Sequence, residues 1–410
     1  METLFTHAQV FDGERLLPEA DAVLIADGKI SAVGACGQFD GYRGPRWSLP
    51  GHTILPGLID CHAHLVLTGD ADVWGPLTRT PAAALALQAL DSAQRCLKGG
   101  VTSLRDCGGV DHIELAVRDA LNSGMFLGPT VRAAGRFICM CGGTNHPVAR
   151  IADGEHEVRV AVREQVHARC DFVKLMATGA VLSPGAVLED VQYTVEELRA
   201  GIQEAQRLGK YAAVHAIGAQ GVMNAVQAGA TSVEHGVFLT DEAIEEMLRR
   251  GTWVVPTLGA VSRIIKHRDR LPVAVVEKAQ RVSESHRKSI ARFYRAGGKL
   301  AMGGDTGTPF NPHGDNAWEL FEMVDAGLTE EAALIAATSS AADLMQLQNR
   351  GRIRVGYEAD ILIVRGNPME DIRFAADTRH HRAIFKAGQM VQTRRWGVIC
   401  HEGGFADEQS

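Results

Sequence analysis

The feature that most constrains the fold is a repeated alternation of short apolar segments with longer helical segments between residues 53 and 303. Each apolar segment has the length and residue types of a buried parallel strand, and a stretch with helical periodicity follows it. The expected strands are Thr53–Ile59, Thr102–Arg105, Thr130–Ala134, Phe172–Met176, Ala212–His215, Ser232–His235, Trp253–Pro256 and Lys299–Gly303. Eight strands with intervening helices predict an α/β protein with a (β/α)8 TIM barrel, and a doubly wound open sheet is the competing architecture.

The two ends of the chain differ from this middle because both are rich in strand-forming residues. The apolar runs on either side of Asp27-Gly28 predict a hairpin. The other expected strand regions are Thr3–Phe11, Ala359–Val364 and Ala383–Gly388. We therefore expect residues 1–52 and 355–410 to form one small β-sandwich domain, and residues 53–354 to form the barrel.

Composition excludes several classes of protein. Lys plus Arg is 42 and Asp plus Glu is 49, so the net charge is -7, and no basic tract is available to neutralise nucleic-acid phosphates. No apolar run approaches the ~18 residues of a membrane span, and the first twenty residues do not resemble a signal peptide. We expect a cytoplasmic homo-oligomer that acts on a small molecule. The 8 cysteines, Cys400 among them, are scattered and need not pair.

The strongest chemical signal is a pair of histidines, His62 and His64, directly after the first expected strand. Side chains two residues apart on a strand point to the same face, and two imidazoles there can share one metal ion. His215 and His235 end later strands, and Asp305 follows another. The carboxyl ends of barrel strands form the active-site face, so these residues predict a metal site, whereas an isolated pair could be two surface histidines.

Lys174 is the one charged residue in the otherwise apolar expected strand Phe172–Met176, which follows Asp171. Burying an ammonium group is costly unless it is paired or neutralised. One interpretation is a lysine whose amine meets a carboxylate at the end of the strand. The other is a neutral amine that CO2 converts to a carbamate, which is a carboxylate long enough to bridge two metal ions.

Seven segments, taken in order, resemble signatures of the amidohydrolase superfamily. They are FDG, PGLIDCHAHL, VKLMATG, VHA, VEHG, GGDTG and GRIRVGYEADILIV. The resemblance covers nearly the whole chain and is to the binuclear, carboxylated-lysine subtype, whose fold is a (β/α)8 barrel with a small β-sandwich built from both ends.

This resemblance implies two divalent metal ions. Zinc is the default, although Mn, Co or Fe would suit the same ligands. It implies His62, His64 and Asp305 as ligands of the more buried ion. It implies His215 and His235 as ligands of the other ion, with Lys174, as N6-carboxylysine, and a hydroxide bridging both.

Residues 174–184 resemble a dipeptidase-like group that includes prolidases, Xaa-Arg/Lys dipeptidases and arginine carboxypeptidase-related enzymes, with relatives that cleave amide or urea bonds in xenobiotics. The chain departs from the group at Ala180, which stands for glycine, and at Ile217, which stands for His or Tyr. The loop of residues 141–147 resembles a Gly-Gly-His loop, but its histidine stands at a later position, His146. These departures lie around the substrate, where Ile217 is an expected contact.

The reaction implied is hydrolysis of an amide C–N bond by a metal-bridging hydroxide, most readily in a dipeptide or an N-acyl amino acid. Asp305 would take the hydroxide proton and pass it to the leaving nitrogen. His146 would contact the substrate carbonyl or oxyanion, unless it is an exposed loop residue. His313 would contact the substrate or orient Asp305. An alternative substrate is an aryl amide, carbamate or urea, because Ile217 cannot bond to a carboxylate.

Three other functions are weaker. A cyclic-amidine deaminase of the same superfamily usually uses one metal ion and a glutamate three residues after the fifth-strand histidine, where this chain has Gly218. A paralogue without metals is disfavoured because every ligand is present. A thiol enzyme using Cys139 or Cys141 has no base placed beside it.

Overall fold

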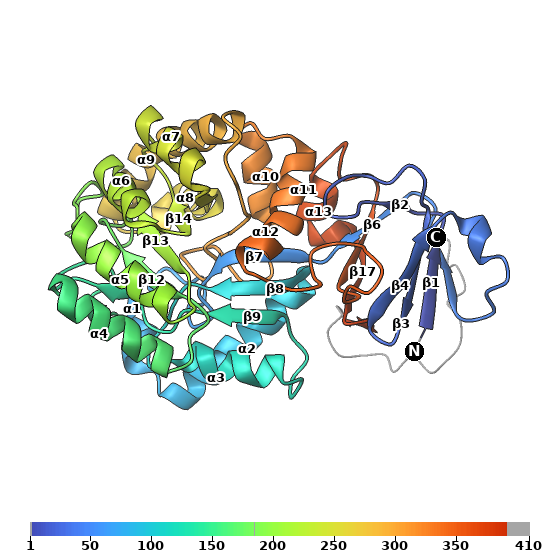
Figure 1. The fold of residues 1–410 in the computed structure, drawn as a ribbon, viewed down its shortest axis with the longest axis horizontal. Coiled ribbons are helices and arrows are strands. Elements are labelled where there is room, and N and C mark those ends of the chain that lie inside the picture. Colours follow the sequence, from blue (N-terminus) through green and yellow to red (C-terminus); the bar gives the residue numbers. More distant parts are fainter. Residues whose placement is uncertain (1, 184, 392–410) are drawn as a thin grey trace.

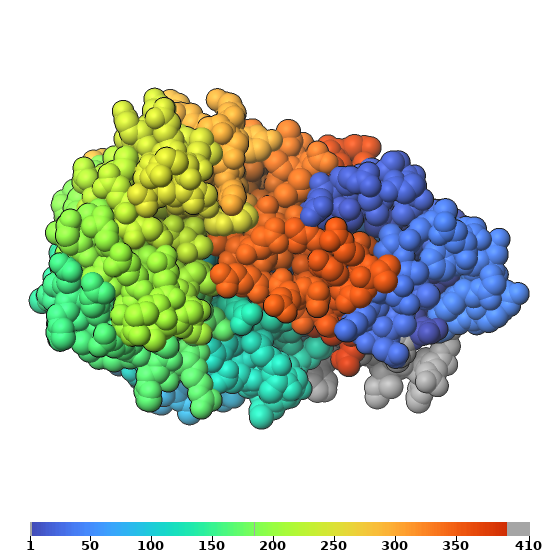
Figure 2. Space-filling model, viewed as in Figure 1, coloured from blue at the N-terminus to red at the C-terminus, as the bar shows by residue number. Residues whose placement is uncertain are grey.

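The computed structural model describes residues 2–183 and 185–391. Figure 1 shows a helix-rich body built from the middle of the chain and a smaller β-rich part to which the N-terminal strands and the last strands both contribute. In the space-filling view, residues of the C-terminal third lie between the helical body and the N-terminal strands (Figure 2). Pro184, Cys400 and the end of the expected sandwich segment, 392–410, lie outside the described residues. None of the described helices combines the length and the apolarity needed to cross a bilayer.

Two sheets make up the β-rich part. One has the order β4-β3-β1-β5 and the other has the order β18-β17-β16-β6-β2. Their strands are β1 (Glu2–Thr6), β2 (Gln9–Val10), β3 (Ala22–Ala26), β4 (Lys29–Gly34), β5 (Arg46–Ser48), β6 (His52–Pro56), β16 (Ile361–Arg365), β17 (His381–Lys386) and β18 (Gln389–Met390). Phe5 and Trp47 from the first sheet pack on Phe385 from the second, with ring centroids 5.1 and 5.8 Å away. The two ends of the chain therefore share one core.

The expected hairpin around Asp27-Gly28 is confirmed. Strands β3 and β4 pair in antiparallel fashion, with Ala26 opposite Lys29. Both turn residues have positive φ, 49° for Asp27 and 80° for Gly28, as a two-residue hairpin turn requires.

The body contains two parallel sheets of orders β7-β8-β9 and β11-β10-β12-β13-β14-β15. Their strands are β7 (Leu58–Ala63), β8 (Val101–Asp106), β9 (Thr130–Ala133), β10 (Ile138–Cys139), β11 (Arg150–Ile151), β12 (Val173–Met176), β13 (Ala212–Ala216), β14 (Ser232–His235) and β15 (Trp253–Val255). The expected alternation of parallel strands with helices is confirmed, although the described strands of the body form two sheets.

Helices follow most of these strands and lie outside the sheets (Figure 1). They are α1 (Trp74–Arg79), α2 (Ala82–Lys98), α3 (Ile113–Asn122), α4 (Gly154–His167), α5 (Val195–Arg207), α6 (Ala219–Ala228), α7 (Asp241–Arg250), α8 (Leu258–Lys266), α9 (Val273–Arg295), α10 (Trp318–Asp325), α11 (Glu330–Ala336), α12 (Ser339–Leu344) and α13 (Arg373–Ala376). Short 3-10 turns occur at Cys36–Phe39, Arg268–Arg270 and Thr378–His380.

The expected first barrel strand, Thr53–Ile59, is wrong as a single strand. Its first half belongs to β6, which pairs with β16 in the β-rich part, and its second half begins β7, which pairs with β8. The partner changes at Gly57, where a Cβ would lie 2.2 Å from a methyl carbon of Thr102. Only glycine lets the backbone pass between the two parts at this distance.

The expected last strand, Lys299–Gly303, is an extended segment joined to both sheets by single pairings rather than a regular strand. Leu300 bridges to Val254 of β15, and Thr306 bridges to Ala63 of β7. A Cβ at Gly303 would lie 2.3 Å from the Val255 side chain, so the segment packs against its neighbours without a side chain of its own at that position.

A buried ion pair joins three strands beneath the carboxyl ends of the sheets. Arg105 on β8 and Glu234 on β14 are both 0% exposed, and the Arg105 Nη2 group donates to both carboxylate oxygens, at 2.8 and 2.9 Å. Arg105 Nε donates to the carbonyl of Cys61 on β7. The guanidinium also lies 5.1 Å from the centroid of the Phe172 ring. The pair therefore fixes β7, β8 and β14 relative to one another.

We predict that Arg105→Met lowers the free energy of unfolding by about 3–5 kcal/mol, because it leaves the Glu234 carboxylate buried without its partner. Chemical denaturation of the purified variant measures this. The matched control is the double variant Arg105→Met/Glu234→Met, which removes both charges and should lose less than the single variant. A single variant within about 1 kcal/mol of wild type would contradict the prediction.

Candidate metal and substrate site

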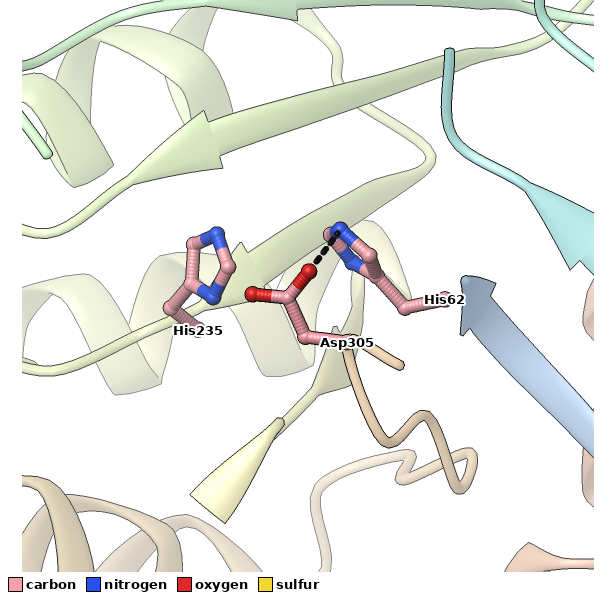
Figure 3. Close-up of side chains that lie close together, drawn as sticks. All are labelled: His62, His235 and Asp305. Atoms are coloured by element: carbon pink, nitrogen blue, oxygen red, sulfur yellow. Dashed lines mark ion pairs between the residues drawn. The ribbon is translucent and has the colours of Figure 1, made fainter. Parts of the chain in front are cut away.

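The histidines and the aspartate expected at strand ends come together at one place. His62, His235 and Asp305 point toward one another, as Figure 3 shows, and each offers a ligand atom within 4.8 Å of the others. Asp305 Oδ1 lies 3.6 Å from His62 Nε2 and 3.3 Å from His64 Nε2. The His215 and His235 ring centroids are 4.6 Å apart. These distances suit ligands that share a small cation or a pair of them.

Each of the four imidazoles has one nitrogen held by the protein, which leaves the other nitrogen for a ligand role. The contacts are His62 Nδ1 to Glu234 Oε2 at 2.7 Å, His64 Nδ1 to Gly108 O at 2.8 Å, His215 Nε2 to Gly179 O at 3.0 Å, and His235 Nδ1 to Thr257 Oγ1 at 2.6 Å. Carbonyl and carboxylate oxygens only accept, so at His62, His64 and His215 the held nitrogen carries the proton. Such partners are typical of metal-ligating histidines, because they fix the tautomer and the orientation of the ring.

The electrostatics favour the protonation states that metal ligands need. Burial lowers the pKa of His215 to about 4 and holds the pKa values of His62 and His235 well below their usual range. Although burial opposes ionisation of Asp305, the imidazoles of His62 and His64 bring its pKa down to about 2. His62, His215 and His235 can therefore bind a divalent cation without first losing protons. At His64, burial lowers the pKa but the contact with Asp305 outweighs it and raises the pKa, so His64 would release a proton on binding.

Lys174 lies on β12, is 1% exposed and lines the same cavity as these ligands. Its Nζ has neither a hydrogen-bond nor an ion-pair partner among the described residues. The interpretation of a lysine paired with a carboxylate at the strand end therefore finds no partner here. A buried ammonium without a partner is costly, so the surroundings suit a modified Nζ better.

Strained backbone supports this arrangement. His235, Thr257 and Asp305 all have positive φ, 73°, 55° and 53°, which is uncommon for residues with side chains and most unfavourable for β-branched Thr257. The amides of the next two residues, Leu258 and Gly259, both donate to the buried Glu319 carboxylate, at 2.8 and 2.7 Å. Glu319 thus holds the start of α8 so that Thr257 reaches His235.

A cavity of about 810 Å³, part of it open to solvent, adjoins the ligand cluster. Its remaining lining is mostly apolar, with a few uncharged polar side chains. The lining residues used below are Thr144, Asn145, Ile217, Val237, Val261, Ile264, Val282, His286 and Thr308. Ile217, which was expected near the substrate, lines the cavity, and Ala180 lines it too.

His146 does not occupy the expected position. Its side chain is exposed and is absent from the cavity lining, and its Nδ1 accepts a hydrogen bond from the backbone amide of Gly142 at 3.0 Å. The preceding residue, Asn145, has a left-handed backbone, with φ of 64°, and lines the cavity instead. The expectation of a carbonyl contact from His146 is therefore corrected: the loop reaches the site through Thr144 and Asn145.

His313 lies behind the site and outside the cavity lining. Its Nε2 donates to the carbonyls of Leu67 at 2.9 Å and His64 at 3.2 Å, and its Nδ1 faces the Cys96 thiol at 3.4 Å. These contacts place His313 against the backbone of His64, without a contact to the Asp305 side chain. The geometry gives it a part in holding the His64 loop, in place of the expected substrate contact.

Two of the weaker functions also lose support from the geometry. At Gly218, a Cβ would lie 2.8 Å from the backbone of Glu189, so this position has no room for the glutamate of a deaminase. Burial raises the pKa of the Cys139 thiol to about 12, which disfavours a thiolate nucleophile.

Sequence reasoning missed several residues that shape the site. Glu234 directly precedes His235, and an acid within a buried strand is the same kind of signal that identified Lys174. Thr257, Glu319 and His286 carried no comparable signal, because their roles depend on how α8, α9 and α10 pack.

Comparison with known proteins agrees with this site. Residues 53–391 match the model of the amidohydrolase family. An ochratoxinase of Aspergillus niger is 30% identical over 371 residues, covering 83% of this chain and 75% of its own. The structure of a Xaa-Pro dipeptidase with bound methionine superposes with a TM-score of 0.88 and 30% identity, covering 96% of this chain and 100% of its own.

A prolidase in complex with N-methylphosphonate-L-proline superposes with a TM-score of 0.85 and 28% identity, covering 96% of this chain and 100% of its own. Amidohydrolases generally bind metal ions, and the cluster of His62, His235 and Asp305 offers suitable ligand atoms. The chain therefore belongs to the amidohydrolase family and is an enzyme that hydrolyses carbon–nitrogen bonds.

Proposed function

We propose that the protein hydrolyses an amide bond at a binuclear metal centre. The observation that carries this proposal is the convergence of four imidazoles, each with one nitrogen free, on Asp305 and the unpartnered Nζ of Lys174. His62, His64 and Asp305 would hold one divalent ion, and His215 and His235 would hold the other. Zinc is our first choice because nitrogen and carboxylate ligands of this kind suit it.

Lys174 would join the two halves of the site as N6-carboxylysine. Its neutral amine attacks CO2, a C–N bond forms, and one proton leaves to solvent, so that the side chain ends in a carboxylate with two oxygens. The buried position of Nζ among histidines, with no acidic partner in the described chain, supports this modification. When bound, two divalent ions supply a nucleophilic hydroxide at neutral pH and polarise the substrate carbonyl.

Asp305 is the group placed to move the proton. Its carboxylate lies between the imidazoles of His62 and His64, and its low pKa keeps it ionised before the reaction. It would accept the proton of the attacking nucleophile and deliver it to the departing nitrogen, which leaves as a neutral amine. Asn145 and Thr144 would orient the substrate from the opposite loop.

We further propose that β7, β8, β9, β12, β13, β14, β15 and residues 299–306 are the eight strands of one (β/α)8 barrel. Pairings of this segment with both β15 and β7 support it, and so does the hydrogen bond from Asp171 N to Ala133 O, 2.9 Å, between β9 and the strand that follows α4. Division into residues 53–354 and a small domain of 1–52 plus 355–410 stays a prediction, as do cytoplasmic location and homo-oligomeric assembly.

Two substrate classes fit this reaction. The names of the relatives, a Xaa-Pro dipeptidase, a prolidase and an ochratoxinase, support a dipeptide or an N-acyl amino acid. The apolar lining of the cavity supports an aryl amide, carbamate or urea.

We expect close to two divalent ions per chain by elemental analysis of metal-replete protein, falling by about one or more in His62→Ala and in His215→Ala because each variant loses a ligand. The control is His146→Ala, whose side chain lies outside the cavity and which should keep the wild-type content. Saturation at one ion or fewer would rule out a binuclear centre.

We expect Lys174→Ala to lose both bound metal and activity, because the bridging carboxylate is gone. Formate or acetate should partly restore both by occupying the vacated volume. Metal content with and without the acid separates this from misfolding, and Lys174→Met is the control for side-chain volume. Full metal content in Lys174→Ala without added acid would count against a bridge.

We expect Asp305→Asn to lower kcat by about 10²- to 10⁴-fold on the best amide substrate, since the amide side chain cannot take the proton. It should keep part of its bound metal, because one oxygen remains. Steady-state kinetics and metal analysis of the same preparation test this. A kcat near the wild-type value would show that another group moves the proton.

A further inference from the structure

One wall of the cavity is made entirely of aliphatic side chains that also pack into a buried cluster. The wall comes from the end of β13, the residues after β14, and helices α8 and α9. We call it the apolar wall, and it consists of Ile217, Val237, Val261, Ile264 and Val282. Because five branched side chains meet the cavity together, the group that lies on them must be broad and apolar to replace the water there.

The charged side chains that line the cavity are those of the proposed metal site. Among the described residues that line it, Lys174 is the only Lys or Arg, and Asp305 is the only Asp or Glu. The polar lining residues away from the cluster are Thr144, Asn145 and Thr308, whose side chains carry no charge, and His286, whose Nε2 donates to the carbonyl of His235 at 2.9 Å.

Of the cations close in sequence to the wall, Lys266 is exposed and does not line the cavity, and the other three are engaged elsewhere. Lys278 Nζ donates to the carbonyl of Ser183 at 2.9 Å, and Arg281 pairs with Glu189. Arg263 pairs with Asp315 at 3.2 Å. None of these three cations reaches the lining. A substrate carboxylate lying against the wall would therefore lose its hydration without gaining an opposite charge, which costs several kcal/mol.

We propose that the substrate is an uncharged amide that carries a broad apolar group, aromatic or branched, and no carboxylate beside the scissile bond. The apolar group lies on the apolar wall, and the uncharged polar residues bind uncharged substrate atoms. This inference rests on the proposed amide hydrolysis, and it selects one of the two substrate classes.

The test is a matched pair of compounds, N-benzoyl-L-phenylalanine and N-(2-phenylethyl)benzamide, which differ only in the carboxylate. With metal-replete wild-type enzyme, we expect kcat/KM to be at least about tenfold higher for the uncharged benzamide, as an unpaired buried carboxylate predicts. Equal values, or a preference for the carboxylate, would overturn the inference while leaving amide hydrolysis intact.

A charge placed in the wall should reverse this preference. Val261 is 9% exposed, the most exposed of the five wall residues, so Val261→Lys can keep its ammonium in the cavity without being fully buried. We expect Val261→Lys to shift the ratio of the two kcat/KM values at least about tenfold toward the carboxylate compound. Val261→Met adds similar length without charge and should keep the wild-type preference. A ratio unchanged in Val261→Lys would contradict the assignment of this wall to the substrate.

Binding measurements separate failure of this inference from failure of the proposed function. If neither compound is hydrolysed, isothermal titration calorimetry of both with the metal-replete enzyme still decides the matter. Binding of the benzamide at least about tenfold tighter would support the uncharged cavity and reject the reaction for this pair. Tighter binding of N-benzoyl-L-phenylalanine would overturn the inference.

Discussion

The buried pair of Arg105 and Glu234 is the interaction on which the site depends. Burial raises the pKa of Glu234, but the Arg105 guanidinium outweighs this effect and lowers it, so Glu234 is a carboxylate. This carboxylate accepts a hydrogen bond from His62 Nδ1–H at 2.7 Å. The opposite nitrogen of His62 is thereby turned toward Asp305. Ion pairs buried this deeply add little net stability over apolar residues, because both partners lose hydration. We infer that this pair is retained because it orients the ring.

The sequence predicted that the side chains of the proposed metal site come together, because their positions follow from local rules. Parallel strands bring their carboxyl ends to one edge, and a spacing of two places His62 and His64 on the same face. Lys174 stood out because burying a cation in an apolar strand is costly unless its charge is paired or neutralised. Glu234 gave a weaker signal of the same kind, because its expected strand, Ser232–His235, has one apolar residue, and its position directly before His235 drew attention to the histidine alone.

Other parts of the molecule could not be predicted, because they depend on contacts between distant segments. Residues 54–59 are continuously apolar, so nothing there marks Gly57 as the point where the chain exchanges β16 for β8 as its partner. His146 was misplaced because the left-handed backbone of Asn145 decides which loop residue faces the cavity. The positions of Val261 and Val282 within α8 and α9 do not tell from the sequence alone that both side chains line the cavity as well as pack into the core.

The single residue between β6 and β7 has a consequence for dynamics. β6 is paired with β16, whereas β7 carries His62 and His64, so one unbroken stretch of backbone belongs to both the β-rich part and the metal site. A cation bound at β7 therefore opposes any opening that would pull β6 away from its sheet. Amide hydrogens of Ile363, on β16 beside β6, and of Ala383, on β17 beside β16, should exchange with solvent more slowly once metal is bound, although neither residue approaches the site.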